Sequence, residues 1–148
     1  MLNKLKQWEY ALSNGFTVRG FYTEPTGRPV IHFVHGNGYC GLVYEQMLEP
    51  LAKHYDIFIS DIQGHGDSDV GGHFRGWNRN AEFCAEVWQD FQKQFWPDVP
   101  AIAMGHSFGG VMSTAHKICK ASFLAPCGVI SPFSLCPPSI WKVPIDNG

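Results

Sequence analysis

A chain of 148 residues has the length of one domain and is long enough to bury a hydrophobic core. Charged residues make up 16% of it and the net charge at pH 7 is −2 without a basic face, which argues against nucleic acid as a partner. No apolar run approaches membrane-spanning length and the polar N-terminus does not resemble a secretory signal, so we expect a cytoplasmic protein without a membrane span. The five cysteines are odd in number and widely spaced, which fits free thiols better than disulfides or a zinc site.

After an N-terminal hairpin, the chain alternates between strand-like and helix-like segments. We place the hairpin turn at Asn14-Gly15, because both central residues of a type I′ turn need a positive φ. The expected elements are, in chain order, hairpin strands at 8–13 and 16–23, a strand at 30–34, a helix at 44–54, a strand at 55–62, a helix at 78–95, a strand starting at 100, a helix at 111–118 and a strand at 121–125. This order predicts an α/β fold with a mainly parallel sheet, helices on both faces and the functional site at the carboxyl ends of the strands.

Three glycine-containing motifs follow three of these strands. They are His35-Gly36-Asn37-Gly38, the stretch from Asp61 to Ser68, and Gly105-His106-Ser107-Phe108-Gly109-Gly110. The carboxyl ends of parallel strands share one edge of a sheet, so we expect the three motifs to meet there. Their coincidence at strand ends carries more weight than any one motif alone.

The last motif predicts a nucleophile elbow. A serine on so tight a strand-to-helix turn is forced into strained backbone angles, and Gly105 and Gly109 are needed because a Cβ there would collide with the neighbouring strand or helix. The turn lifts the Ser107 hydroxyl off the sheet and points the N–H of Phe108 toward an incoming oxyanion. A glycine-rich turn without any chemistry is the plainer alternative.

In this order and at these strand ends, the three motifs resemble the α/β-hydrolase fold family over residues 7–125. The resemblance implies a three-layer fold and a serine hydrolase that acts on an ester, thioester or related acyl bond through an acyl-Ser107 intermediate. It implies a small-molecule acyl substrate, an oxyanion hole made by the backbone N–H groups of Asn37 and Phe108, and no cofactor or metal. A serine at the elbow argues against the dehalogenase and epoxide-hydrolase branches.

The other polar residues of the motifs have structural roles in this interpretation. Asp61, His65 and Asp67 belong to a stretch that is mostly structural in the resembling family, and His35 orders its loop by hydrogen bonding. His106, held inside the elbow, serves packing or specificity. Residues 71–77 are expected to form a mobile polar loop, although their aromatic and cationic side chains suit a pocket wall.

The chain departs from the family pattern after Ser107. In this fold an acid and then a histidine follow the nucleophile. Here His116 and Asp146 follow in the reverse order, and the helix carries His116 away from the hydroxyl at about 1.5 Å per residue. Residues 126–148 are expected to form an irregular tail rich in Pro, Ser and Cys. We therefore expect residues 1–148 to form a single incomplete α/β-hydrolase domain that lacks the C-terminal part of the fold.

Two alternatives to an active hydrolase stay open. In the first, the chain is an inactive fragment or pseudoenzyme that binds a small acyl compound or a partner. In the second, it is half of a two-chain enzyme. Truncation would also expose a sheet edge and invite self-association through that edge. Trp141, Val143 and Ile145 are candidates to cover part of this surface.

Overall fold

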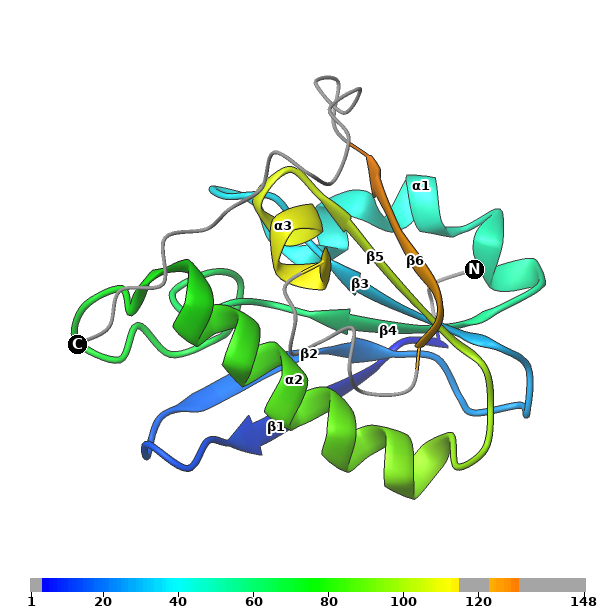
Figure 1. Ribbon diagram of the computed structural model, residues 1–148, viewed down its shortest axis with the longest axis horizontal. Helices are drawn as coiled ribbons and strands as arrows, with labels where there is room; N and C mark the ends of the chain where they lie inside the picture. Colours follow the sequence, from blue (N-terminus) through cyan, green and yellow to red (C-terminus); the bar gives the residue numbers. More distant parts are fainter. Residues whose placement is uncertain (1–3, 115–122, 131–148) are drawn as a thin grey trace.

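The computed structural model describes residues 4–114 and 123–130, which form a six-stranded sheet with helices on both faces (Figure 1). The strands are β1 (Lys6–Ala11), β2 (Thr17–Tyr22), β3 (Val30–Val34), β4 (Asp56–Ser60), β5 (Ala101–His106) and β6 (Phe123–Ile130). The α-helices are α1 (Glu45–Leu48), α2 (Gly76–Phe95) and α3 (Phe108–Thr114), and the 3-10 helices are η2 (Gly41–Tyr44) and η3 (Leu51–Lys53).

The sheet has the strand order β1-β2-β4-β3-β5-β6. β1 pairs with β2, and β2 with β4, in antiparallel fashion, whereas β4, β3, β5 and β6 are mutually parallel. The predicted mostly parallel sheet with an antiparallel N-terminal hairpin is therefore confirmed. β3 lies between β4 and β5, so the loops that follow these three strands open at the same edge of the sheet.

The core lies on both faces of the sheet. α2 and α3 cover one face, where Val87 and Trp88 pack with Trp8 and Phe58, and Met112 packs with the side chains around β5. α1 and η3 cover the other face with a separate hydrophobic cluster made of Ile31, Phe33, Leu48, Ala52, Ile57 and Ile59. Because β3 and β4 are buried on both faces, apolar residues run through them almost without interruption, as the sequence pattern indicated.

The hairpin turn differs from the predicted type I′ turn. The N–H of Leu12 donates to the carbonyl of Phe16, and the N–H of Gly15 donates to the carbonyl of Leu12, both at 2.9 Å. Gly15 has a φ of 95°, while Asn14 keeps a negative φ. The connection is therefore a three-residue loop that ends in a left-handed glycine, and the expected two-residue turn was wrong. The Asn14 side chain accepts the N–H of Phe16 instead, at 3.3 Å.

Two further elements differ from expectation. The helix expected at 44–54 is divided into α1 and η3, because the ring of Pro50 prevents a continuous helix. Residues 126–130, expected to be irregular, continue β6, and its ladder with β5 has register shifts on both sides of Ile102. These shifts lie beside Pro126, which has no N–H to donate. His116, Asp146 and residues 141, 143 and 145 lie outside the described residues.

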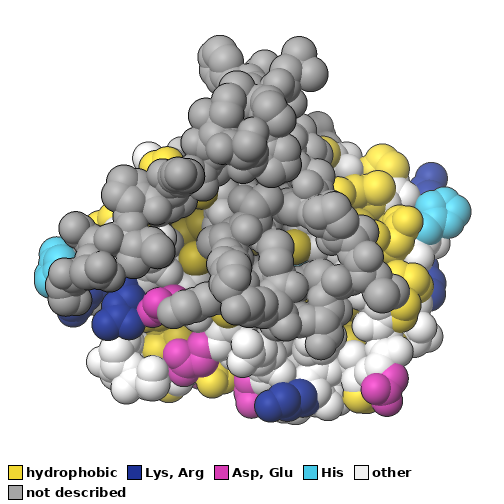
Figure 2. All heavy atoms as spheres, in the orientation of Figure 1, with side chains coloured by type: hydrophobic (Ala, Val, Ile, Leu, Met, Phe, Trp, Pro, Cys, Tyr) yellow, Lys and Arg dark blue, Asp and Glu magenta, His cyan; other side chains and the backbone are white. Residues whose placement is uncertain are grey.

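The described surface mixes charges of both signs. In Figure 2, lysine, arginine, aspartate and glutamate side chains are interspersed along the described part of the face shown. No helix in residues 4–114 and 123–130 is both long and apolar enough to cross a membrane. Over the same residues, no group of three or more His, Cys, Asp or Glu side chains is placed to hold a metal ion.

Candidate active site

The turn between β5 and α3 places Ser107 at the carboxyl edge of the sheet. Ser107 has a φ of 52°, in the left-handed region, where a residue with a side chain carries about 1–3 kcal/mol of strain. Its side chain is exposed, and its carbonyl oxygen accepts the N–H of Val111 at 3.1 Å as α3 begins. The strained turn predicted from the Gly-x-Ser-x-Gly pattern is thus present.

Close backbone packing explains the glycines on either side of Ser107. A Cβ at Gly105 would overlap the backbone of Gly109 and lie 2.6 Å from the nitrogen of Gly110. A Cβ at Gly109 would overlap the carbonyl oxygens of Val34, the last residue of β3, and of His35, which follows it. The elbow therefore rests directly on the strand that leads into the His35-Gly36-Asn37-Gly38 loop.

His35 orders this loop and is poorly suited to act as a base. Its Nδ1 donates to the carbonyl oxygen of Gly36 at 2.8 Å, and its Nε2 accepts the N–H of Ile62 at 3.0 Å. This pattern requires the neutral imidazole, and burial lowers the pKa of His35 to about 4. Its approach to Asp61 at 3.8 Å is consequently not an ion pair at neutral pH.

The loop after β3 leaves one backbone donor available beside the elbow. Within the described residues, the N–H of Asn37 makes no hydrogen bond, and neither does the N–H of Phe108 across the cleft. These are the two donors that the family resemblance assigns to an oxyanion hole. Three neighbouring N–H groups are already occupied by side chains, namely Gly36 by the Tyr44 hydroxyl (3.1 Å), Gly38 by His65 Nε2 (3.1 Å) and Gly41 by an Asp61 carboxylate oxygen (2.6 Å).

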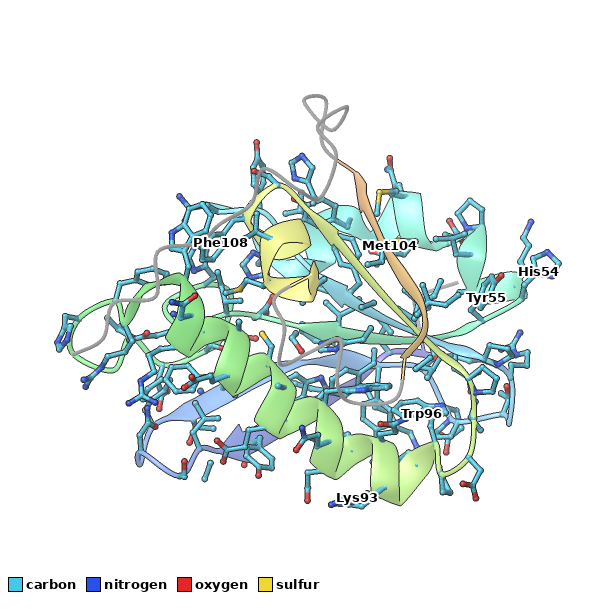
Figure 3. All side chains as sticks on the ribbon, in the orientation of Figure 1. His54, Tyr55, Lys93, Trp96, Met104 and Phe108 are labelled. Carbon is cyan, nitrogen blue, oxygen red and sulfur yellow. The ribbon has the colours of Figure 1, made fainter. Side chains whose placement is uncertain are left out.

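One cleft brings the predicted site residues together. It has a volume of about 620 Å³, and Asn37, Ser107 and Phe108 all line it. Phe108 lies at the start of α3, on the side of the first turns of α2 (Figure 3). The remaining lining residues come from the loop after β4 and from the segment before α2 and its first turn: Gln63, Gly64, His65, Val70, Phe74 and Trp77.

One wall of the cleft is apolar, which the sequence interpretation gave only as the less favoured alternative to a mobile polar loop. Val70, Phe74 and Trp77 are exposed but line the cleft, and the Trp77 ring packs edge-on against Phe108 with centroids 4.8 Å apart. The expectation of an ordinary polar loop at 71–77 was therefore wrong for Phe74 and Trp77. Two aromatic residues close together, Phe74 before α2 and Trp77 in its first turn, were the signal for a pocket wall.

Asp61 and His65 hold the loops around the cleft in place. Asp61 is buried and accepts the N–H of Gly41, while His65 Nδ1 donates to the carbonyl of Gln63 at 2.9 Å. Burial raises the pKa of Asp61 to about 6, with a smaller contribution in the same direction from the charge of Asp67. These contacts agree with the structural roles predicted for Asp61 and His65, and they also place His65 at the cleft.

Replacing Asp61 with asparagine is expected to stabilise the protein at alkaline pH. The pKa of Asp61 is about 6 in the folded chain against an ordinary 3.8, so the folded state binds its proton more tightly than the unfolded state. The stability that this carboxyl contributes is full below pH 3.8 and is lost as the pH rises through 6. A pKa difference of this size between the folded and unfolded states corresponds to about 3 kcal/mol. The asparagine side chain keeps an oxygen for the Gly41 N–H and never ionises.

Urea unfolding of wild type and Asp61→Asn at pH 4, 6 and 8 measures this effect. The free energy of unfolding of the variant relative to wild type should rise by roughly 2–3 kcal/mol from pH 4 to pH 8. If the free energies of unfolding of wild type and Asp61→Asn change with pH in the same way from pH 4 to pH 8, ionisation of the buried Asp61 carboxyl does not destabilise the folded chain.

A family model described as "Serine aminopeptidase, S33" matches residues 25–133. The chain belongs to this family of α/β-hydrolases. The matched residues include all three strand-end motifs, and hence Asn37, Ser107 and Phe108. The family inferred from the motifs is therefore confirmed.

Individual relatives and solved structures agree with this family. The monoglyceride lipase of Mus musculus is 32% identical over 124 residues, covering 79% of this chain and 40% of the lipase. The magnesium-chelatase 30 kDa subunit of Rhodobacter capsulatus is 31% identical over 93 residues, covering 62% of this chain and 31% of the subunit. The crystal structure of a carboxyl esterase from Bacillus coagulans superposes with a TM-score of 0.63 at 24% identity, over 73% of this chain and 38% of the esterase. The chain thus spans less than half the length of each of these proteins.

Proposed function

We propose that this chain carries the nucleophile and the oxyanion donors of a serine hydrolase that cleaves carboxylic esters with an apolar acyl group. The observation that carries the proposal is the strained, exposed Ser107, which lines a cleft together with Asn37 and Phe108, the residues whose N–H groups are unoccupied in the described structure. Relatives named as a lipase and an esterase support the reaction class. The apolar wall formed by Phe74 and Trp77 supports an apolar acyl group.

In the proposed reaction, the Ser107 hydroxyl oxygen attacks the ester carbonyl carbon while a base takes the hydroxyl proton. The former carbonyl oxygen becomes an oxyanion that accepts hydrogen bonds from the N–H groups of Asn37 and Phe108. Collapse of this intermediate breaks the bond to the alkoxy oxygen, the alcohol leaves with a proton, and water then releases the acid from Ser107. Both ring nitrogens of His35 and of His65 are occupied by backbone groups, and Nδ1 of His106 by the Tyr44 hydroxyl, so we propose that the base lies outside the described residues.

Hydrolysis of a short-chain p-nitrophenyl ester tests the proposal. This substrate has a good leaving group, so a nucleophile and an oxyanion hole alone give measurable acyl transfer. Wild type is expected to release p-nitrophenolate well above the buffer rate, and Ser107→Ala is expected to fall to that rate. Ser113→Ala is the matched control, because the Ser113 hydroxyl donates to the carbonyl of Met104 in the same helix-and-strand unit and is buried away from the cleft. Equal rates for wild type and Ser107→Ala would overturn the proposal.

A second candidate function is binding without catalysis. It is favoured by the Rhodobacter capsulatus relative, which is named as a chelatase subunit rather than as a hydrolase. In that case Ser107→Ala leaves ester turnover unchanged, while substitution of Trp77 in the cleft wall still weakens binding of an apolar ligand. The ester assay and a ligand titration on the same two variants therefore separate the two functions.

We also propose that the protein works in the cytoplasm. Cys40 and Cys84 are free cysteines, which is the ordinary state of this residue in a reducing compartment. Burial raises the pKa of Cys84 to about 12, so its thiol stays protonated and unreactive.

A further inference from the structure

One tyrosine hydroxyl joins the two segments that the proposed reaction uses. The Tyr44 hydroxyl accepts the N–H of Gly36 at 3.1 Å and is hydrogen-bonded to Nδ1 of His106 at 2.8 Å. Gly36 directly precedes Asn37, and His106 directly precedes Ser107. We infer that Tyr44 is a positioning residue that fixes the loop after β3 relative to the elbow; this inference rests on the proposed function.

The Tyr44 hydroxyl can make both of these hydrogen bonds at the same time. Because the Tyr44 oxygen accepts the Gly36 N–H, its single proton is free to be donated to Nδ1 of His106. Nδ1 of His106 accepts this proton in the tautomer that carries the ring proton on Nε2. Burial raises the pKa of Tyr44 above its ordinary value of 10.0, so the phenol keeps the proton that it donates.

The rings around this hydroxyl hold it in place. The Tyr44 ring packs on Phe33 of β3 with centroids 4.8 Å apart, and on His106 at 5.7 Å. Gly36 lies so close to both polar groups that a Cβ there would be 2.7 Å from His106 Nδ1 and 3.1 Å from the Tyr44 oxygen. The three groups are therefore already in tight contact, and Gly36 has no room for a side chain.

The other hydrogen bonds that hold the loop after β3 connect it to a different segment. Gly38 is held by His65 and Gly41 by Asp61, both of which belong to the segment after β4. Among the hydrogen bonds that residues 35–41 make within the described chain, the one through Tyr44 alone reaches the elbow. The β3–β5 ladder and the packing of Gly109 on Val34 and His35 fix the elbow against the end of β3, and the Tyr44 hydroxyl adds the hydrogen-bonded link that holds Gly36, and hence Asn37, toward it.

Amide hydrogen exchange and NMR on Tyr44→Phe test the coupling without relying on activity. This variant keeps the ring contacts but removes the hydroxyl, so the Gly36 amide should exchange at least about tenfold faster and the Asn37 and Phe108 amide resonances should move. Tyr39→Phe is the matched control, because the Tyr39 ring lies 6.4 Å from the His106 ring while its hydroxyl makes no hydrogen bond within the described residues. Unchanged exchange at Gly36 in Tyr44→Phe would overturn the inference.

Substitutions of His106 test the second half of the link. His106→Asn keeps an acceptor near the position of Nδ1, so it should preserve the slow exchange of Gly36, whereas His106→Leu removes the acceptor and should lose it. Equal exchange in these two variants would contradict a hydrogen bond that orders the loop.

Ester hydrolysis by Tyr44→Phe tests whether the link between the loop after β3 and the elbow affects the reaction rate. A small misplacement of oxyanion donors lowers the rate by roughly 10- to 100-fold, so Tyr44→Phe should lower kcat by that factor with KM nearly unchanged. A purely structural role would lower the melting temperature but leave kcat at temperatures where the variant is folded. If wild type does not hydrolyse the ester, the proposed function fails and the exchange experiment still decides the role of Tyr44. If wild type is active and Tyr44→Phe has the same kcat, the inference fails.

Discussion

Replacing Gly109 with alanine is expected to disrupt the elbow and to reduce both stability and the reactivity of Ser107. The new methyl group would overlap the carbonyl oxygens of Val34 and His35, which are backbone atoms at the end of a buried strand. Relief requires α3 to move away from β3 and hence from Asn37. We expect a loss of about 2–3 kcal/mol in the free energy of unfolding and a large fall in ester hydrolysis.

Gly72→Ala is the matched control for this prediction. Gly72 has a φ of 85° and nothing lies within 4 Å of its missing Cβ, so alanine there adds backbone strain without a steric clash. We expect this control to lose about 1 kcal/mol and to keep the activity of wild type. Urea midpoints and ester turnover of both variants give the comparison. A Gly109→Ala variant as stable and as active as wild type would show that α3 does not pack on β3 as described.

Replacing Trp88 with alanine is expected to cause the largest loss of stability. Trp88 is fully buried between α2 and the sheet, where its ring stacks on His32 at 5.1 Å and packs against Phe58 at 5.5 Å. Removing it leaves a cavity in a core that joins β3 and β4, the strands that lead into two of the site loops. Such truncations cost about 3–5 kcal/mol, which is a large part of the roughly 5–15 kcal/mol typical of a whole domain.

Trp77 provides a control of the same residue type in the same helix. Its side chain is 53% exposed and contacts Phe108 in the cleft, so Trp77→Ala should lose no more than about 1 kcal/mol of stability. Thermal and urea unfolding of the two variants distinguish these costs. Similar losses for Trp77→Ala and Trp88→Ala would contradict the placement of α2 on the sheet.

The site features that were predicted correctly depend on local chain geometry. A serine between glycines at a strand end has few allowed backbone conformations. The observed φ of 52° at Ser107 is the one that the motif requires. The amphipathic pattern of α2 and the apolar runs of β3 and β4 likewise determine burial within a few residues. These elements therefore follow from the sequence without knowledge of their neighbours.

The features that the sequence missed or ranked second depend on contacts between distant residues. Phe74 and Trp77 become a cleft wall only because α2 begins beside Phe108, and the sequence alone does not fix that distance. Tyr44 contacts His106, 62 residues away in the sequence, and no local sequence pattern predicts this contact. β6 was ended too early because Pro126 resembles a strand terminator, whereas the ladder accommodates it through a register shift.

Labelling with a fluorophosphonate probe shows whether Ser107 is an activated nucleophile. An activated serine displaces fluoride from the probe and forms a stable phosphonyl ester. Intact mass of wild type and Ser107→Ala, followed by peptide mapping, should show a single adduct on Ser107 in wild type and none in the variant. An adduct that persists in Ser107→Ala, or a folded wild-type chain that remains unlabelled, would show that Ser107 is not an activated nucleophile.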